Sequence, residues 1–317
     1  MVGRDGSGST AWWRLFGWWR PLAGIAAAIL LLYYPIGMAW VHTVDDDPAF
    51  APQEVPAGGS RAVATAAALI DRETNQHRWT ANDPFFLPAA ALDNMPNFQQ
   101  GIIGALSRFA VEMGDQIGRT RGSSAIDPDL DKAAGLLKYP GDVWVFDPST
   151  SWVPTASSEK QYRAAERALI SYNERLAAGN AVFERRADNL LATLDRIGKD
   201  LGSMSAVVDQ HIAEGRIALF DGRADDIFYA NKGRLYAYLL LLRALGEDFA
   251  NVVAERDLGP AWQQMLQSLD AAVGLDPLVV MNGAPDAQVV PSHLAAQGFY
   301  LLRARTQIGE IGNILLK

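Results

Sequence analysis

The sequence predicts a mainly α-helical protein in which one N-terminal transmembrane helix precedes a helical bundle. A run of 21 uncharged residues, from Pro21 to Val41, lies close to the N-terminus. In the rest of the chain apolar residues recur at helical spacing, and one long stripe indicates an antiparallel helical hairpin. Segments typical of β-strands are short and few, so we expect at most a very small β element.

The uncharged run is long enough to cross a bilayer. Twenty-one helical residues extend about 31 Å, and a hydrocarbon core is about 30 Å thick. Tryptophans precede the run and Trp40 lies near its other end, as in the aromatic belts of membrane proteins. We therefore expect residues 21–41 to contact the lipid bilayer, with Pro21, Ile29, Leu30, Leu31, Leu32 and Val41 as representative anchor residues.

The flanking charges predict an orientation for this helix. Three arginines lie among residues 1–20, and Asp45, Asp46 and Asp47 follow the helix. The positive-inside rule then keeps residues 1–20 in the cytoplasm and places the main domain in the periplasm of a bacterium, anchored in the inner membrane. Two alternatives remain open at this point: a signal peptide cleaved near Gly37-Met38-Ala39, and a buried core helix.

The composition excludes several classes of function. The 317 residues carry a net charge of −8 and no basic run, which argues against nucleic-acid binding. With no cysteine, disulfides, thiolate metal sites and cysteine nucleophiles are excluded. Residues 1–44 hold three Arg and one Asp, so the remainder carries −10 and would be repelled by anionic lipid. We expect the Pro- and Gly-rich residues 42–59 to form a spacer that holds a helical domain, residues 60–317, away from the membrane.

Helix signals follow one another along this domain. Ser60 and Asp127-Pro128 are expected N-terminal caps, and Asn94 or Asn97 is expected to cap the helix that contains Phe98. The last helix is expected to run from about Ser292 to Leu316. Further helices are expected over 157–178, 180–214, about 227–252, and from Gly259-Pro260 onward. The uncharged run from Leu235 to Leu242 is too short to span a membrane and indicates a buried helix.

The hairpin is predicted from two apolar stripes with the same alternation of three and four residues. One stripe includes Tyr162 and Leu176, and the other runs from Ala187 to Val208. Gly179-Asn180 between them indicates a helix end followed by a helix start. The hairpin is favoured over one continuous helix, and it could pair within one chain or between two copies in a homo-oligomer.

Three proline-rich loops interrupt the helices, at residues 80–97, 139–156 and 276–291. Within them, Val143 to Phe146, Leu278 to Met281 and Gln288 to Val290 are the runs that would pair as a very small sheet. Loops of this length are uncommon without a purpose. Their aromatic, amide and acidic side chains suit a partner or ligand surface, and equally suit a loop held by its own phenylalanines; the candidates are Trp79, Asp83, Phe85, Phe86, Asp93, Asn94, Asn97, Trp144 and Trp152.

The sequence contains no complete catalytic or metal motif, and we expect no cofactor. Glu73 and His77 are spaced to share one helical face, which is half of a metal site at most. Carboxylate pairs such as Asp225-Asp226, or Asp83 with Asp93, meet the minimum requirement of a glycan hydrolase. In a chain with 36 acidic residues such pairs also arise by chance.

The loop sequence resembles a known family. Residues 82–88 (NDPFFLP), 92–99 (LDNMPNFQ), 121–124 (RGSS) and 200–203 (DLGS) are similar to a proteobacterial family classed as domain of unknown function 2333. The resemblance implies a single-span inner-membrane protein. It implies no activity and no catalytic residue.

Three functions are consistent with these observations. The first is a non-enzymatic envelope protein that binds a protein partner through its loops or its hairpin. The second is a cell-wall hydrolase that uses a carboxylate pair around Asp83 and Asp93. The third is a helical ligand-binding domain that works through a partner protein, because residues 1–20 contain no signalling module.

Overall fold

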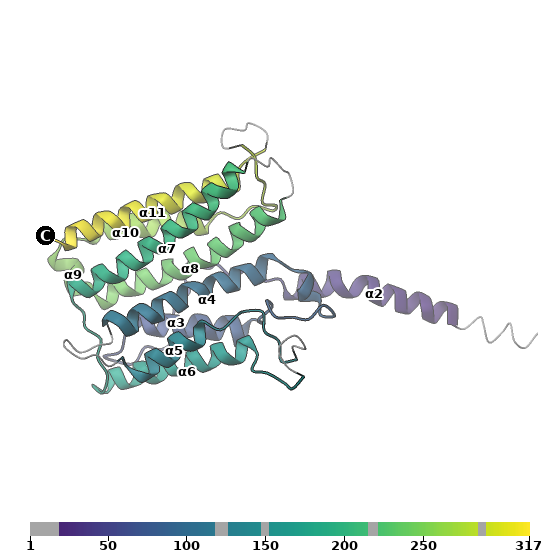
Figure 1. Cartoon of the computed structure of the whole chain (residues 1–317), viewed down its shortest axis with the longest axis horizontal. Coiled ribbons are helices and arrows are strands. Elements are labelled where there is room, and N and C mark those ends of the chain that lie inside the picture. The colour runs from purple at the N-terminus through teal and green to yellow at the C-terminus, as the bar shows by residue number, and fades with distance from the viewer. Residues whose placement is uncertain (1–18, 118–125, 147–151, 215–220, 285–289) are drawn as a thin grey trace, which may run out of the picture.

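The protein is a bundle of helices from which one further helix projects (Figure 1). The structure, a computed structural model, describes residues 19–117, 126–146, 152–214, 221–284 and 290–317, except the side chains of Trp19, Arg20 and Leu30. Over these residues it contains no β-strand, and the only β-bridge joins Asn282 to Ser292. The mainly α-helical prediction is confirmed.

The expected small sheet is absent from the described part of the chain. In the first expected run, Val143 to Phe146, the carbonyls of Val145 and Val143 accept from the backbone N–H groups of Thr155 and Ser158. This run is therefore bonded to the segment at the start of a helix and not to another strand. The third expected run, residues 288–290, lies mostly outside the described residues.

The described helices follow the predicted order closely. They are α2 (Trp19–Val41), α3 (Arg61–Asp71), α4 (Asn94–Glu112), α5 (Pro128–Leu137), α6 (Ser158–Ala177), α7 (Ala187–Ala213), α8 (Gly222–Asp248), α9 (Ala250–Glu255), α10 (Gly259–Val273) and α11 (His293–Leu315), with π-helical turns η1 (Arg72–Gln76) and η3 (Met113–Ile117) and a 3-10 turn η2 (Pro88–Ala91). Ser60 and Asp127 cap their helices through side-chain oxygens, as expected, and Ser292 caps α11 in the same way. The cap of α4 is Asp93, which accepts from Asn94 N–H, so neither expected asparagine has that role.

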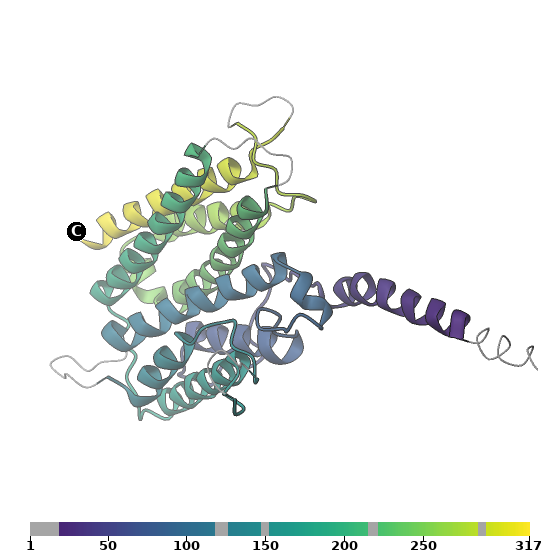
Figure 2. The ribbon, with the colours of Figure 1, turned by 45° about the vertical axis from the view of Figure 1, so that its right-hand side comes forward.

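Two helical bundles share α8. On one side, α3, α6, α5 and α4 pack in a ring that α8 closes through its contacts with α3 and α4. On the other side, α8 packs against α10, α10 against α11, and α11 against α7. Figures 1 and 2 show the two groups on opposite sides of the α4–α8 pair.

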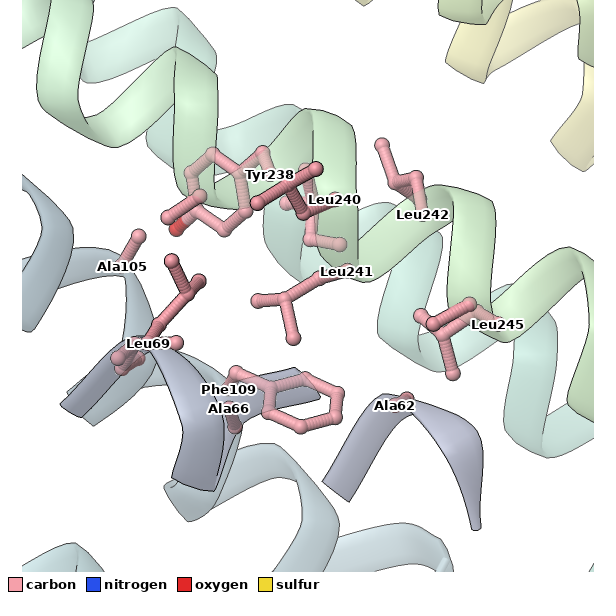
Figure 3. Close-up of a cluster of buried hydrophobic side chains, with 14 of the residues drawn as sticks. Ala62, Ala66, Leu69, Ala105, Phe109, Tyr238, Leu240, Leu241, Leu242 and Leu245 are labelled. Atoms are coloured by element: carbon pink, nitrogen blue, oxygen red, sulfur yellow. The ribbon is translucent and has the colours of Figure 1, made fainter. Parts of the chain in front are cut away.

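The middle of the shared helix α8 is buried on all faces. Every residue from Leu235 to Leu242 is buried, as the sequence predicted for this uncharged run. Where α8 meets α3 and α4, Leu241 and Leu245 lie toward Phe109 of α4 and the alanines of α3 (Figure 3). Small residues on α3, such as Ala62 and Ala66, let the helices approach closely there.

The predicted pairing of the 157–178 and 180–214 helices is wrong. The two helices exist, but α6 packs against α3 and α5, whereas α7 packs against α11 in the other bundle. Gly179 ends α6 with a positive φ of 76°, as expected, yet α7 begins only at Ala187. The intervening chain crosses to the second bundle because Phe183 is buried against Phe249, with ring centroids 5.8 Å apart.

Helix α11 is the true partner of the long apolar stripe of α7. It carries a stripe with the same alternation, formed by buried Leu294, Leu301, Ala304, Ile308, Ile311 and Leu315. Gly312 lies against Leu191, Gly198 against Ile308 and Gly298 against Val208, so the two helices run antiparallel. The stripe therefore pairs within one chain, with a helix about 100 residues further along the sequence.

Residues 42–59 are extended but do not form a free spacer. They fold back along the domain from the end where α2 joins it to the opposite end, where α3 begins (Figure 2). Phe50 packs against the core, and Ser60 N–H donates to the buried Asn173 side chain over 2.7 Å. This segment, which we call the strap, is part of the folded domain.

Helix α2 projects away from the bundle (Figure 1). Among the described helices it is the one long and apolar enough to cross a membrane. Its apolar side chains, including Ile25, Ile29 and Leu31, are exposed. It is therefore not a core helix of the domain.

Candidate functional site at the α2 end of the domain

The three long loops predicted from the sequence lie at the same end of the domain as α2 (Figures 1 and 2). Their described parts link α3 to α4, α5 to α6, and α10 to α11. Since helices alternate in direction, each of these connections returns to this end. The α2 end thus carries every candidate loop residue, and we describe it as the candidate site.

A buried arginine holds the strap at this end. Arg72 is 2% exposed and its guanidinium donates to the Tyr236 hydroxyl over 2.8 Å and to the Asp45 carbonyl over 2.9 Å. It also forms a 2.7 Å ion pair with Glu73, which is 1% exposed. The guanidinium carbon lies 4.7 Å from the centroid of the Phe50 ring in the strap. One buried cation therefore contacts both the strap and the helices of the domain.

The carboxylate of Glu73 is kept ionised by its neighbours. Burial alone would raise the pKa of Glu73, but the interactions with His77 and Arg72 lower it below its ordinary value. Gln99 also donates to this carboxylate over 3.1 Å. The Glu73–His77 pair considered as half of a metal site is thus part of an ion network. Among the described residues no group of three or more His, Cys, Asp or Glu is placed to hold a metal ion.

A second buried cation holds the next strap residue. The Lys232 side chain is fully buried, and its ammonium lies 2.8 Å from the Asp46 carboxylate and 2.9 Å from the Leu275 carbonyl. Tyr236 donates to the Asp47 carbonyl over 2.9 Å, and Arg243 donates to the carbonyl of the next residue, Pro48. All three aspartates that follow α2 are therefore fixed to α8 or to η1.

The candidate loop contacts α2 directly. The Tyr33 hydroxyl donates to the Phe86 carbonyl over 3.1 Å, and the Tyr34 hydroxyl donates to the Phe85 carbonyl. Pro88, at the start of η2, packs against Gly37. These contacts and the strap join α2 to the domain at two places.

Part of the predicted loop set forms a polar hollow of about 370 Å³ beside η1. Trp79, Asp83 and Trp144 line it, together with His77, which the sequence analysis considered only with Glu73, and with Glu159 and Arg163, which it did not single out. Asp83 forms a 2.7 Å ion pair with Arg78, and burial raises the pKa of its carboxyl despite that partner. π-Helical turns such as η1 are frequent at functional sites, which makes this hollow a candidate ligand surface.

Other candidate loop residues lie in a separate acidic cluster. Asn97 donates to Asp226 over 2.7 Å, and the Asn94 amide, oriented to satisfy its neighbours, donates to Asp93 and Asp225. Asp93 is therefore grouped with the α8 aspartates, whereas Asp83 is grouped with Arg78 and Glu159. The structure does not bring Asp83 and Asp93 together as a catalytic pair.

The acidic cluster predicts a pH-dependent stability. Burial, then the charges of Asp93 and Asp226, raises the pKa of Asp225 from 3.8 to about 6. Between these values the folded protein holds a proton that the unfolded chain releases, so stability falls as the pH rises through this window. We expect Asp225→Asn to stabilise the protein at pH 7.5 by about 1 kcal/mol, after allowing for solvent screening, and by nothing near pH 4.

Urea denaturation of the full chain in detergent at both pH values measures this effect. Asp209→Asn, an exposed aspartate on α7, is the matched control and should change neither midpoint. Equal stabilisation of Asp225→Asn at both pH values would show that the effect is not electrostatic.

The remaining predicted residues lie outside both groups. Trp152 is 90% exposed, and Phe85 and Phe86 are exposed beside α2. Sequence reasoning missed Arg72, Lys232 and Tyr236, which hold the strap. The available signal was the Asp45–Asp47 run, which was interpreted only as a topology signal.

Comparison with known proteins places the chain in a family. A family model described as an uncharacterised protein conserved in bacteria, domain of unknown function 2333, matches residues 17–220 and 222–317. The chain belongs to this family. The match confirms the resemblance inferred from the loop sequence, and it covers both α2 and the bundle. Comparison with curated proteins and with solved structures found no match.

Proposed function

We propose that the protein is a non-enzymatic interaction or scaffold protein of the bacterial envelope, anchored once in the inner membrane. Residues 1–20 would lie in the cytoplasm and the helical domain in the periplasm. The observation that carries the proposal is the junction: an exposed apolar helix is fixed to the domain by buried ion pairs, not by a flexible linker.

The anchor is supported by the exposure of α2. A helix of this length and hydropathy with none of its span buried in the domain needs an apolar environment, which a bilayer supplies. Cleavage after Ala39 would remove Tyr33 and Tyr34, whose hydroxyls bond to the candidate loop. The contacts of α2 with the domain therefore favour a retained anchor over a signal peptide.

An interaction role is supported by the fixed geometry. With the strap locked, the polar hollow and the exposed Trp152 are presented at a constant position relative to α2. Large exposed aromatic side chains on a rigid support are typical of binding surfaces. We place the partner surface at this end, on the side of the hollow and the 152–155 segment.

Photo-cross-linking in living cells tests this role. A photoreactive amino acid at Trp152 or at Val153, both exposed, should cross-link to the same envelope protein. The same probe at Leu316, exposed at the opposite end of the domain, should not (Figure 1). Absence of adducts from both loop positions, or identical adducts from Leu316, would contradict partner binding at this end.

A further inference from the structure

We propose that residues 84–92, which we call the apolar loop, insert into the periplasmic leaflet of the bilayer beside α2. This would give the domain a second membrane contact and seat it on the bilayer. The inference rests on the proposed anchoring by α2 and goes beyond it, because a single-span anchor needs no further insertion.

The composition of the apolar loop suits lipid. The nine residues Pro-Phe-Phe-Leu-Pro-Ala-Ala-Ala-Leu carry no charge and lie between Asp83 and Asp93. Phe85 is 83% exposed and Phe86 is 48% exposed. Such a run on the surface of an acidic domain would have its apolar side chains in water unless another apolar phase covers them.

The position of the loop along α2 indicates that this apolar phase is the bilayer. Met95 lies level with the end of α2, where Thr43 N–H approaches its sulfur at 3.3 Å. Pro88 then lies at Gly37, and the Phe86 carbonyl lies at Tyr33. The loop therefore follows α2 back toward its middle. Eight residues separate Tyr33 from Val41, so the phenylalanines lie about 12 Å below the end of the helix at 1.5 Å per residue.

The backbone of the loop is adapted to an apolar phase. Non-helical backbone is tolerated in a membrane only where its polar groups have partners within the protein. Leu87, Ala90 and Leu92 N–H groups donate to carbonyls three residues earlier. The carbonyls of Phe85 and Phe86 accept the tyrosine hydroxyls of α2. The anchor thus supplies donors to the part of the loop that lies deepest.

Aromatic side chains continue from the apolar loop into the connection between α5 and α6. Phe86 packs edge-on against Trp144, and Trp144 packs edge-on against Phe146, each with ring centroids 5.7 Å apart. Phe146 is exposed. Aromatic rings of this kind favour the membrane–water interface, where they would hold the domain against the bilayer.

Spin-label accessibility in nanodiscs tests the insertion. The chain contains no cysteine, so Phe86→Cys, Ala90→Cys, Ile29→Cys and Leu316→Cys each provide a single labelling site in the full chain. The protein is reconstituted in phosphatidylethanolamine–phosphatidylglycerol nanodiscs, and collision of the label with oxygen is compared with collision with a water-soluble nickel chelate. Unchanged thermal unfolding of each variant confirms the fold, and Phe86→Cys retains the backbone carbonyl that Tyr33 contacts.

We expect labels at residues 86 and 90 to collide with oxygen severalfold more than with nickel, as at residue 29, and the label at residue 316 to show the reverse. Nickel accessibility at residues 86 and 90 equal to that at 316, with residue 29 in lipid, would overturn the insertion and leave the anchor intact. Protection from both reagents would also overturn it and indicate a protein contact. A water-accessible residue 29 would refute the anchor itself.

Discussion

Gly233→Ala is expected to destabilise the protein by about 3 kcal/mol or more, because α4 and α8 cross with their backbones in contact. A Cβ atom at Gly233 would lie 2.0 Å from the Phe98 carbonyl oxygen, and one at Gly101 would lie 2.3 Å from the Ala230 carbonyl oxygen. Neither obstacle is a side chain that can turn away, so the helices must separate. Since α8 belongs to both bundles, the separation affects both. Urea denaturation of the full chain in detergent measures the loss.

Gly135→Ala is the matched control for this crossing. Gly135 lies in α5, it is exposed, and a Cβ there meets no atom within 4 Å. The substitution should be neutral or stabilise by up to about 1 kcal/mol, because alanine favours the helix over glycine. If Gly233→Ala and Gly135→Ala had the same midpoint, the close approach of α4 and α8 would be refuted.

Local features of this fold were predictable from the sequence. Side-chain caps at Ser60 and Asp127 act on backbone groups two or three residues away, so their residue types suffice to place the helix starts. The buried run in α8 was likewise predictable from its uninterrupted apolar sequence. Each of these signals is contained within one turn or one helix.

The choice of partner for each helix was not predictable. The stripes of α6, α7 and α11 all repeat every three and four residues, so any two would pack with acceptable geometry. Proximity in sequence favoured α6 with α7, whereas the linker held by Phe183 leads to the other bundle. The glycines that fit α7 against α11 identify the partner only once both helices are positioned.

The candidate site was predictable in location but not in grouping. The long loops lie together at the α2 end, yet Asp83 and Asp93 belong to different clusters there. The strap was missed because its partners, Arg72 and Lys232, lie far along the chain from Asp45 and Asp46. A proline-rich segment is interpreted as a linker when the buried cations that bind it are not known.

Arg72→Met is expected to destabilise the protein by about 3–5 kcal/mol and to release the strap. The substitution leaves the carboxylate of Glu73, 1% exposed, without its cation in the interior. It also removes the donors to Tyr236 and to the Asp45 carbonyl and the cation beside the Phe50 ring. Denaturation in detergent measures the stability. Limited proteolysis within residues 45–59 under native conditions measures release of the strap.

Two further variants test whether the destabilisation by Arg72→Met comes from the unpaired buried charge or from the loss of any arginine. Arg61 pairs with Glu247 on the surface, where both side chains are about half exposed, so Arg61→Met should cost at most about 1 kcal/mol. Arg72→Met combined with Glu73→Gln removes both charges and should recover most of the stability, because the main penalty is the unpaired carboxylate. The strap should remain sensitive to protease in this double variant, since the donors to Asp45 are still absent. Protease resistance equal to wild type in both Arg72 variants would show that Arg72 is not needed to hold the strap, and that the contacts of Asp46 and Asp47 with α8 are sufficient.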